Sequence, residues 1–306
     1  MNFLVTGGAG FIGSNLVDFL IAKNHKVTVI DNLTSGNIDN LTINKNIILI
    51  KKNLSTINVN DFKNFNGIFH LAAQTSVPFS IKNFSLSSKN NLMSSISIFD
   101  IAKKYKLPIV YASSSSVYGN LSLGDDEVNN LDILSPYALD KLTLENYARL
   151  SYKLYGIPSI GLRFFNVFGP RQNAKSSYSG VISVFIYKLL NNLEITINGG
   201  YQTRDFVFVD DVVKIMYLSM IKILNNNIVE IINVGTGKSI SIDLLLKKLT
   251  KIIKNNSKIL RVDLPVGDPE KSNGQFNKLK TLLNIKQKDF SKFEDSLIST
   301  INYFKK

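Results

Sequence analysis

The chain has 306 residues, 44% of them hydrophobic, and a net charge of +13 at neutral pH. This length can bury a large core in one big domain or two modest ones. With no cysteine and two histidines it has neither disulfides nor enough ligands for an ordinary zinc site, so we expect no metal. No apolar run reaches the ~20 residues of a membrane span, and the N-terminus enters a strand-like pattern at once, so we expect a cytoplasmic protein without a membrane partner.

The excess of Lys and Arg raises the question of a polyanionic partner such as nucleic acid. The lysines are scattered among Asn and Ile, as in the segment 51–66, and form no basic run. Such scatter is typical of a solvated surface, so we expect no nucleic-acid partner. A non-catalytic NAD-binding or RNA-binding protein, with salt-sensitive binding, is the distant alternative.

Residues 1–31 predict a βαβ unit, with strands in MNFLVTG and KVTVID and a helix in SNLVDFLIAK. The glycines Gly7, Gly10 and Gly13 allow a tight turn, a close approach to a pyrophosphate and close packing of the helix, whose N-terminus offers N–H groups to phosphates. Asp31 ends the second strand, where a carboxylate can bind an adenosine ribose and would repel a 2′-phosphate. We therefore predict NAD rather than NADP as cofactor. Three turn glycines in an unrelated α/β protein are the alternative.

The alternation of strands and helices continues beyond this unit. IILIKKNL, GIFHLAA, PIVYASSSS and IPSIGLRFFNVFG read as strands, with helices around 92–106 and 137–155. This pattern predicts an α/β fold with a Rossmann-like, doubly wound parallel sheet, in which ligands lie at the carboxyl ends of the strands. Residues 113–116 and 71–74 fall at such ends.

Tyr137 and Lys141 are four residues apart, which places both side chains on one face of the second of these helices. An ammonium close to a phenol favours the phenolate and can lower the pKa of the tyrosine toward neutrality. Tyr137 could therefore move protons. The alternative is an ordinary exposed helix face.

After Gly169 the pattern loosens into a polar, turn-rich segment. A helix in VISVFIYKLLNN, a strand in ITINGG, a strand and helix in RDFVFVDDVVKIMYLSM and another pair in INVGTGKSISIDLLLKKLTKII follow, before a helical segment ending in KLKTLL. Because no Pro/Gly/Ser linker marks a cut, we expect interleaved domains. The NAD-binding domain would comprise 1–168 plus 204–234, and a smaller lobe 169–203 plus 235–306.

Seven motifs carry a resemblance over nearly the whole chain: TGGAGFIGSN, DNLTSGN, HLAAQ, SSSSVYG, SPYALDK, LRFFNVFGPRQ and TRDFVFVDD. In order and spacing they resemble the extended short-chain dehydrogenases/reductases, the NAD-dependent epimerases/dehydratases, and within these the UDP-sugar 4-epimerases. The resemblance implies a nucleotide-sugar-binding smaller lobe. It also implies a 4-epimerase of UDP-N-acetylhexosamine and/or UDP-hexose that works through a 4-keto intermediate and supplies surface polysaccharide. A UDP-glucuronate 4-epimerase, or another nucleotide-sugar oxidoreductase of the extended family, is the alternative.

The resemblance also implies residue roles. Tyr137 would be the acid/base at the sugar hydroxyl on carbon 4, Lys141 would lower its pKa and hold the nicotinamide ribose, and Ser114 would hydrogen-bond the hydroxyl. The implied NAD contacts are Gly7, Gly10, Phe11, Ile12, Gly13, Asp31, Asn32, Ser35, Gly36, Asn53, Leu54, Leu71, Ala72, Ala73, Gln74, Asn91, Tyr137, Lys141 and Phe165. The implied substrate contacts are Ser76, Ser114, Tyr137, Asn166, Arg204 and Ser272. Helices near 95–104 and 143–153 would pair across a two-fold axis into a homodimer.

Several positions depart from the family pattern. Ser115 and Ser116 stand where members that dehydrate or decarboxylate the sugar have an acidic residue, which favours epimerisation or simple redox chemistry. Asn53 replaces the usual Asp of the adenine loop, a mild loss of charge. Pro265 replaces an Arg that binds the diphosphate, and Arg261 or Lys271 could take its place.

Two substrate positions have open alternatives. Ser272, four residues after Asp268, would leave room for an N-acetyl group where a Tyr leaves room only for a hydroxyl; otherwise it is a loop residue in solvent. Arg204 would hold the diphosphate side, or else form a surface ion pair with Asp205 or its neighbours.

Overall fold

The computed structural model describes residues 1–128, 130–175, 179–255, 257–264 and 269–305. Contacts divide the chain into two compact units. Unit 1 comprises Met1–Val117, Ile133–Arg163 and Val213–Ile232, and unit 2 comprises Tyr118–Asp132, Phe164–Val212 and Asn233–Lys306. The domain boundaries expected from the sequence follow motifs rather than contacts, and they stay a prediction.

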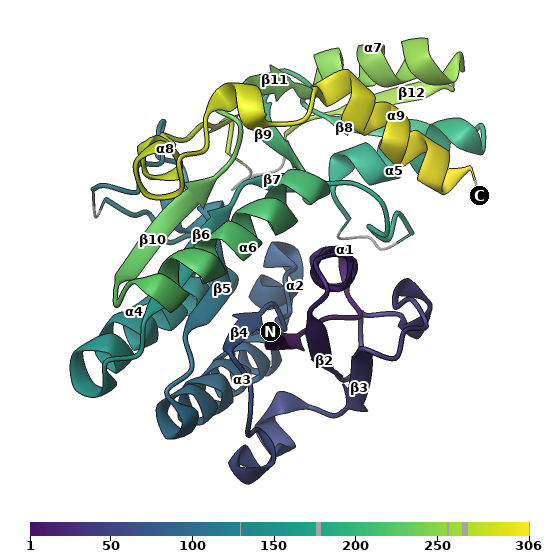
Figure 1. Ribbon diagram of the computed structural model, residues 1–306. Helices are drawn as coiled ribbons and strands as arrows, with labels where there is room; N and C mark the ends of the chain where they lie inside the picture. Colours follow the sequence, from purple (N-terminus) through teal and green to yellow (C-terminus); the bar gives the residue numbers. More distant parts are fainter. Residues whose placement is uncertain (129, 176–178, 256, 265–268, 306) are drawn as a thin grey trace. The chain divides into compact units, whose positions relative to one another are not determined.

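Unit 1 is built on a seven-stranded parallel sheet with the order β10-β6-β5-β4-β1-β2-β3 (Figure 1). Its strands are β1 (Asn2–Thr6), β2 (Lys26–Asp31), β3 (Ile47–Lys51), β4 (Gly67–His70), β5 (Ile109–Ser114), β6 (Ser159–Phe164) and β10 (Val229–Val234). The chain builds outward in one direction from β1 to β3 and in the other from β4, so the topological switch point lies between β1 and β4. Ligands of such sheets bind outside the carboxyl ends of the strands at this point. The predicted Rossmann-like α/β fold is confirmed.

Helices cover this sheet because its strands are apolar on both faces. The helices are α1 (Phe11–Ala22), α2 (Val77–Lys82), α3 (Phe84–Tyr105), α4 (Pro136–Tyr155) and α6 (Val209–Asn225). Leu4 and Ile68 belong to a core cluster with side chains of α3 and α4, whereas Phe3 and Phe69 contact each other and Phe3 contacts His25. Phe19 of α1 packs on Tyr217 of α6 at 5.6 Å between ring centroids. The two-residue alternation of each strand thus supplies two separate apolar layers.

The turn between β1 and α1 shows why glycine is needed there. Gly7 has φ +68°, and a Cβ atom added to it would lie 2.7 Å from the backbone nitrogen of Ala72. A Cβ atom added to Gly13 would lie 2.1 Å from the carbonyl oxygen of Gly7. The first glycine therefore provides a left-handed turn beside the loop after β4, and the last lets α1 pack on the turn.

Unit 2 contains two small sheets. Strand β9 (Thr203–Phe208) pairs with β11 (Ser239–Ser241), β13 (Lys271–Ser272) and β7 (Asn166–Phe168), while β8 (Ile195–Asn198) pairs with β12 (Ile259–Val262). The helices of this unit are α5 (Val181–Leu190), α7 (Ile242–Ile253), α8 (Asn277–Leu283) and α9 (Phe293–Phe304). Phe168, Phe206 and Phe293 form an aromatic cluster that packs α9 on β7 and β9.

One predicted element is wrong. The segment 157–169, expected to be a single strand, forms two strands in different sheets, β6 and β7. The chain changes sheets at Phe165, whose N–H bonds the carbonyl oxygen of Val234 before β7 begins its parallel pairing with β9. A continuous apolar run shows burial but not which sheet provides it. The short elements α2, β11, β12 and β13, and the helix α9, were not predicted.

Replacing Gly13 by alanine should lower the free energy of unfolding by about 1–3 kcal/mol or more, since the new methyl group meets the backbone of Gly7. Gly10→Ala is the matched control: its Cβ would meet no atom nearer than 3.2 Å, so the loss should stay under about 1 kcal/mol. Denaturant titrations of both variants measure the difference. Equal stability of Gly13→Ala and wild type would contradict the close packing of this turn.

Candidate active site

Helix α4 carries the predicted acid/base pair, and its start is set by local sequence. Ser135 caps the helix by accepting a hydrogen bond from the N–H of Ala138 at 3.1 Å, and Pro136 occupies the first turn, where its missing N–H costs nothing. Tyr137 is 8% exposed and Lys141 is 5% exposed, so both lie on the buried face of α4. The alternative of an exposed helix face is thereby excluded.

The structure brings Ser114, Tyr137 and Lys141 together at the carboxyl end of β5. The Tyr137 hydroxyl and Ser114 are hydrogen-bonded, and Ser114 Oγ also accepts the N–H of Ser116 at 3.1 Å. Lys141 Nζ donates to the carbonyl oxygen of Ala112 at 2.7 Å and lies 5.6 Å from the centroid of the Tyr137 ring. A phenol, a hydroxyl and an ammonium are therefore available to one reacting hydroxyl or carbonyl group.

The expected lowering of the tyrosine pKa is not found in the protein alone. Burial raises the pKa of Tyr137 to about 12, and the hydrogen bond with Ser114 lowers it only in part. Lys141 directs its ammonium to Ala112 rather than to the phenol oxygen. Burial also lowers the pKa of Lys141 to about 8, against the opposing effect of Asp140 and Glu145. In the chain by itself Tyr137 is consequently a proton donor at neutral pH.

Helix α4 also carries buried carboxylates beside the trio: sequence reasoning named Asn91 and Gln74 as cofactor contacts but missed Asp140 and Glu145. Asp140 accepts a hydrogen bond from Asn91 Nδ2 at 3.0 Å, while Asn91 Oδ1 accepts the N–H of Gln74 at 2.8 Å. Glu145, one turn beyond Lys141, is completely buried. The sequence places Glu145 four residues after Lys141, on the same helix face, but its partners Ser113 and Arg163 are far from it in the chain and could not be predicted.

The residues at the switch point fit a dinucleotide. Gly7 in the turn and Gly13 in the first turn of α1 leave this region free of side-chain atoms. Phe11 and Ile12 are the first residues of α1, at the helix N-terminus that can bind phosphates. Asp31, at the end of β2, accepts the N–H groups of Ala9 at 3.0 Å and Leu33 at 2.8 Å. Its carboxylate keeps lone pairs for a ribose hydroxyl and places negative charge where a 2′-phosphate would lie.

Hydrogen bonds hold the loop after β4 in place. Thr6 Oγ1 accepts the N–H groups of Leu71 and Ala72, both at 3.2 Å, and bonds His70 Nδ1 at 2.8 Å. Burial lowers the pKa of His70 to about 3, with a smaller contribution from Lys141, so this histidine is neutral and structural. Thr6 was also absent from the sequence predictions.

The other predicted unit 1 residues are placed as follows. Asn32 and Asn53 are exposed and accept backbone N–H groups of their own turns, whereas Leu54 lies in the hydrophobic core at 4% exposure. Ser76 caps α2 by accepting the N–H of Phe79 at 3.1 Å. Ser35 is exposed, and the other three, Gly36, Ala73 and Gln74, are half-buried.

Unit 2 holds the other predicted contacts. Arg204 is 9% exposed, so it is not a surface residue, and its Nη1 donates to the carbonyl oxygens of Thr203 and Pro269. Ser272 is half-buried in β13, in register with Arg204. It is thus not a loop residue in solvent. Phe165 is buried against Tyr118 and Phe276, and Asn166 begins β7.

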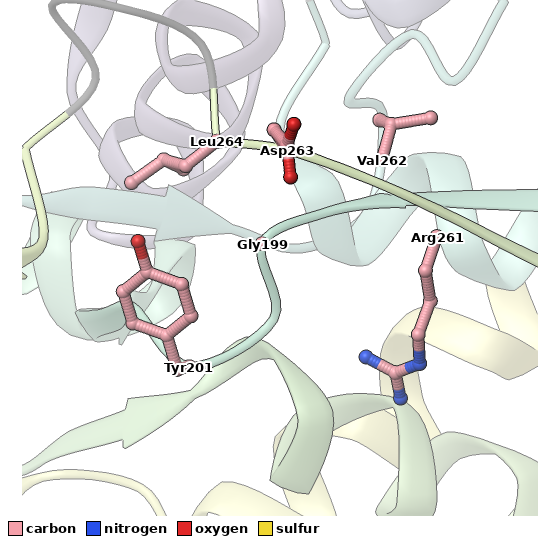
Figure 2. A pocket seen from close by; sticks show the side chains of 6 residues that line it. All are labelled: Gly199, Tyr201, Arg261, Val262, Asp263 and Leu264. Atoms are coloured by element: carbon pink, nitrogen blue, oxygen red, sulfur yellow. The ribbon is translucent and has the colours of Figure 1, made fainter.

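A pocket of about 400 Å³ in unit 2 is lined by Gly199, Tyr201 and residues 261–264 (Figure 2). Tyr201 and Leu264 flank Gly199, and Arg261 forms an ion pair with Asp243 at 2.9 Å. None of the predicted substrate residues lines this pocket. Pro265 and Asp268 lie outside the described residues, so the roles suggested for Arg261 and Lys271 stay predictions.

Among the described residues, no three His, Cys, Asp or Glu side chains gather as a metal site. Over the same part of the chain, no helix is both long and apolar enough to cross a membrane.

Comparison with known proteins gives concordant results. Residues 3–235 match the NAD dependent epimerase/dehydratase family. A Methanocaldococcus jannaschii protein, provisionally named a UDP-glucose 4-epimerase, is 42% identical over 82% of this chain and 81% of its own. The UDP-N-acetylglucosamine 4-epimerase of Methanobrevibacter ruminantium, solved with UDP-N-acetylmuramic acid, aligns with a TM-score of 0.92 and 35% identity over 99% of this chain and 97% of its own. The UDP-glucose 4-epimerase of Thermotoga maritima, solved with UDP-glucose, aligns with a TM-score of 0.91 and 32% identity over 100% and 99% of the two chains.

The glycine turn, Asp31 and the buried tyrosine–lysine pair are thus found in a chain whose sequence and fold match the same group of enzymes over most of their length. This protein belongs to the NAD-dependent epimerase/dehydratase family, the extended short-chain dehydrogenases/reductases that use NAD and include the UDP-sugar 4-epimerases.

Proposed function

We propose that this enzyme is a 4-epimerase of a UDP-linked sugar, working through a 4-keto intermediate. The observation that carries the proposal is the trio at the carboxyl end of β5, in which the half-buried Ser114 meets the buried Tyr137 and Lys141. Ser115 and Ser116 follow it where an elimination would need an acid. Relatives that include UDP-glucose and UDP-N-acetylglucosamine 4-epimerases support the same reaction.

NAD, when bound, supplies a positively charged hydride acceptor that can also return the hydride. Tyr137 accepts the proton of the 4-hydroxyl as the carbinol is oxidised, and gives it back when the ketone is reduced on its other face. Ser114 holds the sugar oxygen at the phenol through both steps. Lys141 stabilises the phenolate that Tyr137 must be before the first proton transfer and that forms again after the second.

The raised pKa of Tyr137 has a consequence for this cycle. A phenol with a pKa of about 12 gives up its proton only where positive charge is close. The ammonium of Lys141, buried with a pKa of about 8, is the protein's own source of such charge. The enzyme should therefore lose activity when Lys141 is neutral, even though its fold is intact.

For the substrate we propose a UDP-N-acetylhexosamine, with plain UDP-hexoses also accepted. Ser272 is small, half-buried and in register with Arg204, which suits a position beside the sugar and diphosphate. The product would supply surface polysaccharide synthesis. UDP-glucuronate is the second candidate, because a UDP-glucuronic acid 4-epimerase of Bacillus cereus aligns with a TM-score of 0.90 and 30% identity.

We also propose a homodimer. Helices α3 and α4 pack side by side, and α4 exposes Leu139, Leu150 and Leu154 on the face opposite Tyr137. Met93 of α3 adds a further apolar side chain at 42% exposure. A second copy of this face would cover these side chains in a four-helix arrangement.

Incubating the NAD-loaded enzyme with UDP-glucose, UDP-N-acetylglucosamine and UDP-glucuronic acid, then separating the epimers by chromatography, tests the reaction.

Tyr137→Phe should fold and bind NAD but lose ~10²–10⁴-fold in kcat, because the ring still packs while the titrating oxygen is gone. Tyr152→Phe is the matched control on the same helix, since its hydroxyl bonds only the carbonyl of Asn227 among the contacts described. More than a tenth of the wild-type rate in Tyr137→Phe would contradict the assignment.

Ser272→Tyr should weaken transition-state binding of UDP-N-acetylglucosamine by about 1–3 kcal/mol or more, which lowers its kcat/KM. The kcat/KM for UDP-glucose should fall much less. The added ring would occupy the space of the acetyl group. Ser272→Ala removes the hydroxyl without adding bulk and serves as the control. An unchanged ratio of the two kcat/KM values in Ser272→Tyr would remove Ser272 as the determinant of sugar size.

Sedimentation of the wild type at micromolar concentration should show a dimer. Leu150→Glu should convert it to monomer, because a carboxylate in an apolar interface has no partner. Leu244→Glu, at a comparably exposed leucine of α7, should leave the dimer intact. A wild-type monomer would refute the proposed assembly.

A further inference from the structure

Glu145 lies in the core of unit 1 although the reaction just proposed gives it no role. It is 0% exposed, and its carboxylate forms a bidentate pair with Arg163, through Nε at 2.8 Å and Nη2 at 2.7 Å. The same carboxylate accepts a hydrogen bond from Ser113 Oγ at 2.6 Å. One side chain of α4 is thus joined to β5 and to β6.

Such a buried pair is a poor way to gain stability. Removing two charges from water costs several kcal/mol for each ion, and apolar side chains of similar volume often do as well. What a bidentate carboxylate–guanidinium pair supplies better than apolar packing is a fixed geometry. Its position within the fold therefore matters more than its strength.

That position is beside the candidate catalytic trio. Tyr137, Lys141 and Glu145 are spaced by four residues and share the buried face of α4. Ser113 directly precedes Ser114, so a hydrogen bond that fixes Ser113 also fixes the strand residue carrying the second catalytic hydroxyl. Lys141 donates to Ala112, one residue earlier on β5. Ala112, Ser113 and Ser114 of the strand are thereby hydrogen-bonded to side chains from three successive turns of the helix.

We propose that Glu145 is a positioning residue, which sets the register of α4 on β5 by binding Ser113 and Arg163 together. Because Glu145 lies one helical turn from Lys141, its carboxylate also favours the protonated form of that lysine. The inference rests on the proposed function, because positioning matters only if Tyr137 and Ser114 act on one substrate oxygen. Glu145 itself touches neither substrate nor cofactor in this role.

The charge effect depends on all groups that face Lys141. On α4 these are Asp140 and Glu145, which raise the pKa of Lys141, and Tyr137, whose ring it approaches. From β4 the neutral His70 faces it, and from β6 the guanidinium of Arg163 is ion-paired with Glu145. Burial has the larger and opposite effect and brings the pKa of Lys141 to about 8, which is close to physiological pH. Removing one of the two carboxylates should therefore lower the pKa of Lys141 further.

The test begins with Glu145→Gln, which keeps the shape of the side chain and removes its charge. In protein labelled with ¹³C at lysine Cε, the Lys141 resonance is identified by its loss in Lys141→Met, and its titration midpoint should fall by about one pH unit in Glu145→Gln. At pH 8 the lost charge should lower kcat by ~5-fold, because the protonated fraction of Lys141 falls, and this part of the rate should be recovered at lower pH. The titration needs no substrate, so it decides the charge effect even if no UDP-sugar is turned over.

Two further variants separate position from charge and replace Glu145→Gln if it does not fold. Glu145→Asp retains the charge one methylene further back, so the Lys141 midpoint should return close to the wild-type value. Ser113→Ala retains both charges and removes the bond to β5; kcat should fall ~10-fold with little change in KM or in the midpoint. Glu194→Gln, which breaks an exposed ion pair with Lys258, is the control and should change neither quantity.

A Lys141 midpoint in folded Glu145→Gln equal to that of wild type would overturn the charge effect. A wild-type kcat in Ser113→Ala would overturn the positioning effect. If Glu145→Gln only lowers the unfolding temperature, with kcat and its pH profile unchanged, the buried pair is structural and the proposal is wrong.

Discussion

A buried ammonium is the constraint on which the rest of unit 1 depends. Lys141 can stay charged inside the protein only where carboxylates and a carbonyl group compensate for lost water. Asp140, Glu145 and the carbonyl of Ala112 supply that compensation. The last two require α4 to lie along β5, whereas Asp140 joins α4 to α3 through Asn91. The contacts that keep Lys141 charged therefore also fix the packing of α4, and with it the position of Tyr137.

The structural settings of the candidate catalytic and cofactor residues were predictable wherever the signal was local. The glycine turn, the carboxylate at the end of β2 and the four-residue spacing of Tyr137 and Lys141 each lie within one or two elements. In the structure Gly7 forms a left-handed turn that leaves no space for a side chain, and Tyr137 and Lys141 share the buried face of α4. The alternation of strands and helices predicted the sheet for the same reason.

Groups that act across the sheet were not predictable, because their partners are far apart in sequence. Thr6 bonds residues 71 and 72, Asn91 bonds Asp140, and Ser113 bonds Glu145. The tyrosine pKa was misjudged for a related reason: spacing reports that an ammonium is near, but only the fold shows how completely the phenol is buried. The split of β6 from β7 likewise depends on which strands are available as partners.

Thr6 ties together two loops that are 65 residues apart in the chain. Its hydroxyl accepts the N–H groups that begin the loop after β4, and the next residue, Gly7, leaves no space between that loop and the glycine turn. The loops at the switch point are therefore held in one arrangement before any ligand arrives. Because little conformational freedom remains to be lost, association with a dinucleotide can proceed at a low entropic cost, which favours a long-lived complex.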